Sequence, residues 1–202
     1  MRKFPIILSA ALLAWCCTGC GTPDTGSEPD ISAAADSAND SGTSQSSTFT
    51  ALHSFNANTL GGGTFTASDL ADADVNIIHI WSTTCPPCIE EMPQVAAFAA
   101  ALPENVRLMI WCLDAEYSQA ADRIPAFLEQ SGYSGITLTS GDGDLNTLYG
   151  ELMYTPTTLF YDKNGDLAGE AVIGAGSITQ RYTEQINAAL AAQGLDPLPA
   201  EP

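Results

Sequence analysis

The chain has 202 residues, of which 24 are acidic and 6 are basic, and its formal net charge at pH 7 is −18. Binding of nucleic acid needs clusters of Lys and Arg, so this charge balance argues against nucleic acid as a partner. The same balance disfavours electrostatic adsorption to anionic lipid. Hydrophobic residues make up 45% of the chain, which supports a buried core of domain size.

The N-terminus predicts export. A basic start, an apolar run over residues 4–15 that is too short to span a bilayer, and a stretch of small residues form a signal peptide over residues 1–19. Its end, with Gly19 before Cys20, resembles the lipobox of bacterial lipoproteins, although Cys17 stands where that pattern usually has Leu. The resemblance implies cleavage before Cys20 and a lipid anchor on its thiol. Secretion with a free N-terminus is the alternative.

The next segment has the composition of a linker. Between the anchor and residue 48 the chain is rich in Ser, Thr, Asp, Ala, Gly and Pro, and Ile31 is its only large apolar residue. Such a segment cannot bury enough surface to offset the entropy lost on ordering. We therefore expect a lipid-anchored flexible tether over residues 20–48, a folded domain over residues 49–195 and a C-terminal tail over residues 196–202.

Strand and helix signals alternate through the folded part. Glycines at 61–63 between alternating apolar residues predict a β-hairpin, and the apolar run 75–81 predicts a buried strand. Pro125 is expected to disturb the middle of a helix over residues 117–130. The remaining predicted elements are helices over 89–102, 145–149 and 178–190, strands over 106–113 and 136–139, and a hairpin of 157–161 with 167–173. This order predicts an α/β domain of three layers.

Cys85 and Cys88 are separated by two residues where a predicted strand meets a predicted helix. At a helix N-terminus, free backbone N–H groups and the helix dipole stabilise a thiolate, and a thiol one turn later can resolve a mixed disulfide. The spacing therefore predicts thiol–disulfide exchange. A zinc site and a static structural disulfide are the alternatives, but zinc would need a second Cys or His pair. No metal or cofactor is expected.

Four motifs carry a resemblance to a known family: Ile80-Trp81-Ser82-Thr83-Thr84-Cys85-Pro86-Pro87-Cys88, Glu91-Met92-Pro93, Thr155-Pro156-Thr157-Thr158-Leu159-Phe160 and Asp162-Lys163-Asn164-Gly165. Together they resemble the extracytoplasmic TlpA/ResA-like thioredoxins over roughly residues 49–195. The resemblance implies a thioredoxin-like fold in three layers, with a central mixed sheet and an N-terminal β-hairpin. The family usually has an aromatic residue directly before the first cysteine, where this chain has Thr84.

The resemblance also implies roles for individual residues. Cys85 would be the exposed nucleophile, and Cys88 the buried resolving thiol of a redox-active disulfide. Glu91 would tune the thiol pKa values or relay a proton, since an anion near a thiolate raises its pKa. The implied substrate-docking residues are Thr155, Pro156 after a cis peptide bond, Trp81, Thr84, Pro86 and Pro87.

Each of these roles has a simpler alternative. Glu91 could be a solvated helix carboxylate, Pro156 an ordinary turn proline and Trp81 a core residue. His79 occupies a strand position that is often Asn in relatives, and we expect a hydrogen-bonded strand residue there rather than a catalytic base. Cys112 lies in an apolar strand, where a buried inert thiol is expected.

The function implied is a thiol–disulfide oxidoreductase on the extracytoplasmic face of the bacterial cell membrane, anchored through Cys20. We expect a monomer that reduces disulfides in exported proteins with electrons from a membrane transporter of the CcdA/DsbD type. An oxidant that introduces disulfides is the main alternative, followed by a thiol peroxidase and a non-enzymatic binding lipoprotein. The motif does not fix the direction, because the reduction potential depends on the free-energy difference between the two redox states.

Overall fold

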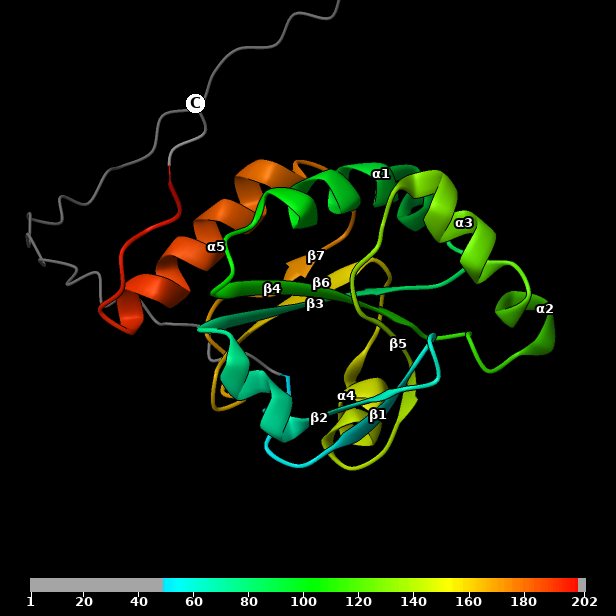
Figure 1. Ribbon diagram of the computed structural model, residues 1–202, viewed down its shortest axis with the longest axis horizontal. Helices are drawn as coiled ribbons and strands as arrows, with labels where there is room; N and C mark the ends of the chain where they lie inside the picture. Colours follow the sequence, from blue (N-terminus) through cyan, green and yellow to red (C-terminus); the bar gives the residue numbers. More distant parts are fainter. Residues whose placement is uncertain (1–48, 200–202) are drawn as a thin grey trace, which may run out of the picture. The chain divides into compact units, whose positions relative to one another are not determined.

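The structure is a computed structural model that describes residues 49–199 (Figure 1). The predicted signal peptide, the predicted lipid anchor at Cys20 and the tether predicted over residues 20–48 lie outside these residues.

A single mixed sheet runs through the described part of the chain, with its seven strands in the order β2-β1-β5-β4-β3-β6-β7. The strands β3, β4 and β5 are parallel neighbours, and β6 and β7 continue the sheet in antiparallel pairing. The N-terminal hairpin of β1 and β2 pairs with the other side of β5. The strand bounds are β1 Asn56–Thr59, β2 Thr64–Thr66, β3 Val75–Trp81, β4 Val106–Cys112, β5 Thr137–Gly141, β6 Thr157–Asp162 and β7 Val172–Ile173.

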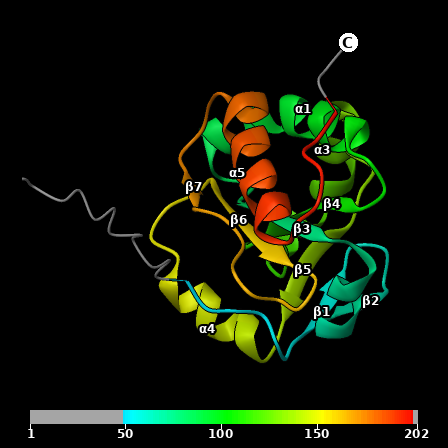
Figure 2. The same ribbon diagram turned by 90° about the vertical axis from the view of Figure 1, so that its left-hand side faces the viewer.

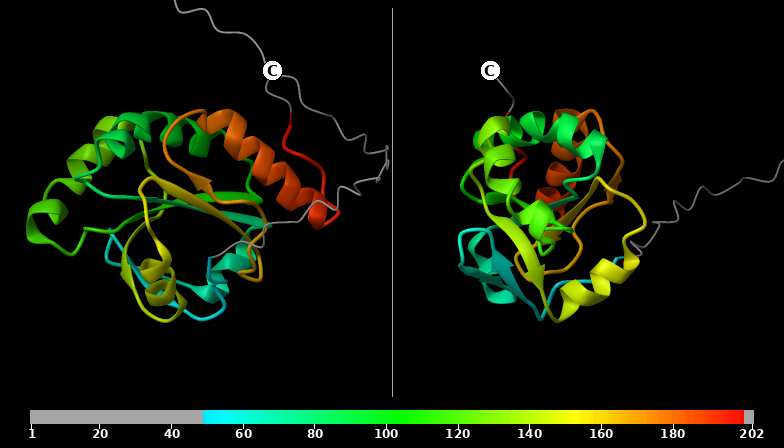
Figure 3. Two further views of the ribbon diagram at one scale, coloured as in Figure 1. Left: turned by 180° about the vertical axis from the view of Figure 1, so that it is seen from behind. Right: turned by 90° about the vertical axis from the view of Figure 1, so that its right-hand side faces the viewer.

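Helices cover both faces of this sheet, which gives the three predicted layers (Figures 2 and 3). The helices α1, α3 and α5 lie on one face, and α4 lies on the other with the short 3-10 helix η1. The helix bounds are η1 Ala67–Asp72, α1 Pro86–Ala101, α2 Ser118–Ala121, α3 Ile124–Ser131, α4 Asp144–Glu151 and α5 Ile178–Ala192.

The central strand β3 is buried along its whole length. Its alternate side chains enter two apolar clusters: Ile77 packs on the side of α1 and α5, and Ile78 packs on the side of α4. Helix α5 buries the face that its sequence period predicts, formed by Ile178, Tyr182, Ile186, Ala189 and Leu190. The continuous apolar run of β3 therefore has the physical cause expected of a strand covered on both faces.

Three predicted elements differ from the structure. The helix expected over 117–130 is divided into α2 and α3, and Pro125 lies in the first turn of α3, where no intrahelical N–H bond is needed. The helix predicted over 89–102 spans Pro86–Ala101, so that Pro86 and Pro87 occupy the early helix positions that suit proline, and it continues through Pro93. The second strand of the last hairpin shortens to Val172–Ile173, with a single bridge between Tyr161 and Leu167 nearer the turn.

The turn of that last hairpin depends on a glycine. Gly165 has a φ of +86°, and its carbonyl oxygen accepts a hydrogen bond of 2.8 Å from the backbone N–H of Leu52. A Cβ atom at position 165 would collide with the carbonyl oxygen of Leu52. Gly62 also has a positive φ, of +81°, but a Cβ atom there would meet nothing within 4 Å.

We therefore expect Gly165→Ala to lower the free energy of unfolding by about 2–3 kcal/mol, because backbone strain and a steric clash add. Gly62→Ala is the matched control, with a cost of about 1 kcal/mol from the positive φ alone. Urea unfolding of the purified protein measures both values. Equal losses in the two variants would contradict the role assigned to the close approach of Leu52.

Candidate active site

Cys85 and Cys88 form a disulfide at the junction of β3 and α1, with their Cα atoms 5.3 Å apart. Cys85 is the N-cap of α1, and Pro86 and Pro87 occupy the first positions of the helix. The Sγ atom of Cys85 accepts a hydrogen bond of 3.3 Å from the backbone N–H of Cys88. Cys85 is 9% exposed and Cys88 is 0% exposed, so the first sulfur is the more accessible one, as predicted.

The loop before Cys85 is held by a carboxylate from the neighbouring strand. Asp114, just after β4, accepts hydrogen bonds of 2.9 Å from the N–H and 2.6 Å from the hydroxyl of Thr83. Partial burial acts to raise the pKa of Asp114, but the hydrogen bonds outweigh it and the pKa lies below the usual value. Sequence reasoning missed Asp114, although its place after a predicted parallel strand could have suggested it, since such strand ends share one edge of a sheet.

The third thiol of the described residues, Cys112, is buried and free. Its S–H group donates to Asp114 at 3.2 Å. Burial raises the pKa of the Cys112 thiol, and the Asp114 carboxylate raises it further. A thiol that stays protonated is a poor nucleophile, so the structure agrees with the expected inert thiol.

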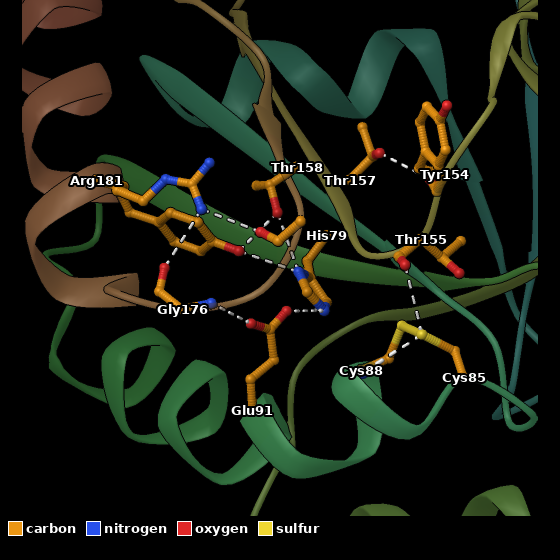
Figure 4. Close-up of polar contacts among 12 residues, drawn as sticks. His79, Cys85, Cys88, Glu91, Tyr154, Thr155, Thr157, Thr158, Gly176 and Arg181 are labelled. Atoms are coloured by element: carbon orange, nitrogen blue, oxygen red, sulfur yellow. Dashed lines mark hydrogen bonds and ion pairs between the residues drawn. A yellow bond between two sulfur atoms is a disulfide. The ribbon is translucent and has the colours of Figure 1, made fainter. Parts of the chain in front are cut away.

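A second segment, just before β6, approaches the disulfide; β6 neighbours β3 on the side opposite β4. The peptide bond between Thr155 and Pro156 is cis. The carbonyl oxygen of Thr155 lies 3.5 Å from the Sγ atom of Cys85 (Figure 4). A disulfide sulfur carries no proton, so this is a van der Waals contact in the oxidised protein. After reduction, the Cys85 thiol would be able to donate to the same oxygen.

Trp81 does not lie at the surface that a partner could touch. It is 0% exposed, and its ring centroid lies 5.1 Å from that of Phe127. The structure therefore places Trp81 in the core beneath the site and not among the docking residues that the resemblance implies. Thr84, Pro86 and Pro87 are exposed beside Cys85, as a docking role requires.

Exposed apolar side chains adjoin the disulfide in sequence and in the sheet. Ile89 directly follows Cys88, and Met153 and Tyr154 precede Thr155. The fourth residue, Ile173, is on β7, which pairs with the start of β6. We call these four residues the apolar rim. Their exposed fractions are Ile89 39%, Met153 78%, Tyr154 68% and Ile173 49%. Sequence reasoning did not single out this rim, because a lone exposed apolar residue has no distinctive pattern.

Glu91 is buried, so it is not a solvated helix carboxylate. It lies on α1 one turn after Cys88, is 5% exposed, and accepts a hydrogen bond of 3.0 Å from the N–H of Gly176. Burial raises the pKa of Glu91, while the Gly176 N–H and the Arg181 guanidinium partly offset that effect. The carboxyl group therefore takes up a proton more readily than an exposed Glu.

His79 is buried on β3 next to Glu91 (Figure 4). Its Nδ1 atom lies 3.0 Å from the hydroxyl oxygens of both Thr158 and Tyr182, which agrees with the predicted hydrogen-bonded strand residue. Its Nε2 atom lies 3.8 Å from Oε1 of Glu91. Burial lowers the pKa of His79 to about 4, so the ring is neutral at pH 7.

Residues 33–185 match the model of the Redoxin family. The chain belongs to this family. Solved structures with similar folds include DsbF from MTB in its mixed oxidised and reduced forms, with 26% identity, a TM-score of 0.56, and coverage of 70% of this chain and 99% of that one. StoA from Bacillus subtilis has 22% identity and a TM-score of 0.53, over 65% of this chain and 96% of its own. No curated protein matches the sequence significantly.

A third similar structure is the pneumococcal exposed lipoprotein thioredoxin Etrx1 from Streptococcus pneumoniae. It has 19% identity and a TM-score of 0.53, over 65% of this chain and 97% of that one. The thioredoxin-like fold and the resemblance to the TlpA/ResA-like family are confirmed. With its Cys85–Cys88 disulfide, this Redoxin-family protein is a thioredoxin-like thiol–disulfide oxidoreductase.

Two further findings concern the described residues. Between residues 49 and 199, no group of three or more His, Cys, Asp or Glu side chains could hold a metal ion. Within the same range, no helix is long and apolar enough to cross a bilayer.

The three thiols of the described residues should differ in alkylation. After reduction, iodoacetamide should label Cys85 first, Cys88 more slowly because it is buried, and Cys112 only after unfolding, because its thiol stays protonated. Peptide mapping by mass spectrometry measures each rate, and a sample in denaturant is the control in which all three react. Labelling of native Cys112 at the rate of Cys85 would contradict the assignment.

Proposed function

We propose that this protein reduces disulfides in exported proteins from the extracytoplasmic face of the bacterial cell membrane. The observation that carries the direction is the buried carboxyl group of Glu91, one helical turn after Cys88. A carboxylate near a dithiol disfavours the thiolate form. A less stable reduced form makes the pair a stronger reductant, because reduction potential follows the stability of the dithiol relative to the disulfide.

One effect in the structure opposes this direction. Cys85 lies at the N-terminus of the helix α1, and its sulfur accepts the N–H of Cys88. Both features favour a thiolate and thus the reduced form, as an oxidant requires. An oxidant that introduces disulfides is therefore the second candidate function, and the reduction potential decides between the two.

The proposed reaction consists of two thiol–disulfide exchanges. A dithiol of a membrane transporter of the CcdA/DsbD type first reduces the Cys85–Cys88 disulfide. The Cys85 thiolate then attacks one sulfur of a target disulfide, which forms a mixed disulfide and releases the other target sulfur as a thiolate. Cys88 attacks Cys85, the internal disulfide forms again, and the target leaves as a dithiol. Glu91 accepts or supplies a proton in these steps.

The proposed target is a disulfide in an extended segment with apolar neighbours. The apolar rim would bury these neighbours, while the backbone of Thr155 before Pro156 would pair with the segment. Thr84, Pro86 and Pro87 would contact it on the other side of Cys85. The proposed anchor at Cys20 and the tether to residue 48 would keep the site close to the membrane donor. The exposed lipoprotein Etrx1, which has a similar fold, supports this location.

The reduction potential of the Cys85–Cys88 pair tests the direction. Equilibration against dithiothreitol or glutathione buffers should give a value near that of thioredoxin, about −270 mV. A value near about −120 mV would mean that the protein introduces disulfides, and the proposed direction would be wrong.

Trapping tests the roles of Cys88 and the apolar rim. A Cys88→Ser variant should accumulate mixed disulfides with a disulfide-containing apolar peptide, because Cys85 attacks and nothing resolves the product. Adding Tyr154→Ala should slow trapping about three- to tenfold, since burial of an aromatic ring contributes about 1 kcal/mol. Tyr149→Ala is the matched control, because Tyr149 is 55% exposed on α4, which lies on the opposite face of the sheet from α1. Equal slowing by both substitutions would refute docking at the rim.

A further inference from the structure

The imidazole of His79 has one nitrogen without a hydrogen-bond partner. His79 is 0% exposed, and its Nε2 atom is one of three buried side-chain nitrogen or oxygen atoms in the described residues that lack a partner. An unsatisfied buried polar atom costs about 1–3 kcal/mol, so native structures contain few of them. The cost suggests that this nitrogen has a function.

Three elements face the imidazole. On the Nδ1 side are the hydroxyl groups of Thr158 on β6 and Tyr182 on α5, which also bond to each other at 2.6 Å. Burial raises the pKa of Tyr182, so its hydroxyl group stays neutral. On the Nε2 side is Oε1 of Glu91 on α1, at 3.8 Å (Figure 4). The ring therefore has two hydroxyl partners on one side and a single carboxyl group on the other.

The other carboxyl oxygen of Glu91, Oε2, has a different partner. It accepts a hydrogen bond from the N–H of Gly176. The Arg181 guanidinium donates to the carbonyl oxygens of Ile173 and Gly174 and not to Glu91. Arg181 therefore favours a negative Glu91 without a direct bond to it. Oε1 is left pointing toward His79 (Figure 4).

The distance of 3.8 Å is too long for a hydrogen bond. We assign the proton of neutral His79 to Nδ1, which then donates to a hydroxyl group. In this tautomer Nε2 carries a lone pair, and the lone pair repels a carboxylate oxygen. If Glu91 gains a proton, the repulsion becomes attraction, because the acid O–H can donate to Nε2. A shift of about 1 Å would bring the two atoms within hydrogen-bond distance.

We propose that His79 is a positioning residue for proton transfer at the dithiol: its neutral Nε2 holds Glu91 in the acid form after Glu91 has taken the proton of Cys88. This inference rests on the thiol–disulfide exchange proposed above and adds a second residue to its proton path. Cys88 and Glu91 are both buried and lie one turn apart on α1, so they share a face of the helix.

The step balances with the groups present. In a mixed disulfide on Cys85, the Cys88 thiol gives its proton to the Glu91 carboxylate, and the resulting acid donates to Nε2 of His79. The Cys88 thiolate attacks Sγ of Cys85. The Cys85–Cys88 bond forms, the bond from Cys85 to the partner sulfur breaks, and the partner leaves as a thiolate with the electron pair. The two protein sulfurs are oxidised, and the partner disulfide is reduced to two thiols.

The rate of this resolving step against pH tests the proposal. Reduced full-length protein is mixed with the aromatic disulfide dithionitrobenzoate, and Cys85 releases one coloured thiolate and Cys88 the second. We expect His79→Asn to slow the second release about tenfold below pH 7, equivalent to a change of one unit in an effective pKa. Above about pH 9 the variant and the wild type should converge, because Cys88 then ionises without a base.

Two controls separate this role from a structural one. Glu91→Gln should show the same loss at low pH, and His79→Asn should add nothing in the Glu91→Gln background, because His79 acts through Glu91. The double variant Cys85→Ser, Cys88→Ser measures the background from other thiols. Slowing by one factor at every pH, or an additive effect in the double variant of His79 and Glu91, would overturn the proposal.

Nuclear magnetic resonance of the imidazole nitrogens gives a second test that needs no variant at His79. The chain has only two histidines, and His53 pairs with Asp166 at the surface. We expect the Nε2 resonance of His79 to titrate with different midpoints in the oxidised and reduced protein, and to lose this difference in Glu91→Gln. The His53 resonances should not depend on the redox state. A His79 resonance that is identical in both states at every pH would refute the inference.

The outcomes also separate this inference from the proposed function. The dithionitrobenzoate reaction follows the dithiol itself and is independent of the natural partner and direction. A reduction potential in the oxidant range would overturn the direction and leave the pH effect of His79 intact. A wild-type protein that releases no second thiolate would instead overturn the exchange chemistry, and the role of His79 with it.

Discussion

The site depends on the antiparallel pairing of β6 with β3. β3 ends just before Cys85, and β6 begins just after Pro156. Their register sets Thr158 opposite His79, so the carbonyl oxygen of Thr155 reaches the sulfur of a cysteine 70 residues away. A slip of one residue would turn the side chain of Thr158 to the other face of the sheet. Burial of β3 on both faces opposes such a slip, because it would expose or misplace the side chains of both apolar clusters.

Two electrostatic effects of opposite sign act on the dithiol. The N-terminus of α1 favours a negative sulfur at Cys85, while the carboxyl group of Glu91, one turn after Cys88, disfavours it. Proton uptake by Glu91 would reduce the second effect, since a neutral acid does not repel a thiolate. The proton on Glu91 and the charge on the dithiol are therefore coupled, and the neighbouring His79 can influence the chemistry without touching either sulfur.

The surface around the disulfide differs in character from the strongly acidic composition of the chain. Ile89, Met153, Tyr154 and Ile173 are exposed, and each lies next to the cysteine pair or the Thr155–Pro156 segment in the sequence or in the sheet. Tyr154, on the segment before Pro156, is the aromatic member of this set and is 68% exposed. Apolar contact is non-directional and weakly sensitive to salt, so the docking proposed at this rim would favour partners that share an apolar segment rather than one fixed sequence.

The fold class, the reacting pair Cys85 and Cys88, and the buried faces of β3 and α5 could all be predicted before the structure was known. These follow from local signals, namely the period of apolar residues and the spacing of a motif along one strand and helix. Three features became visible only in the folded protein: Asp114 holds the active-site loop, Trp81 is a core residue, and the free nitrogen of His79 faces a buried carboxyl group. Those features depend on distances between elements that are far apart in the chain, and hydrophobic period carries no information about such distances.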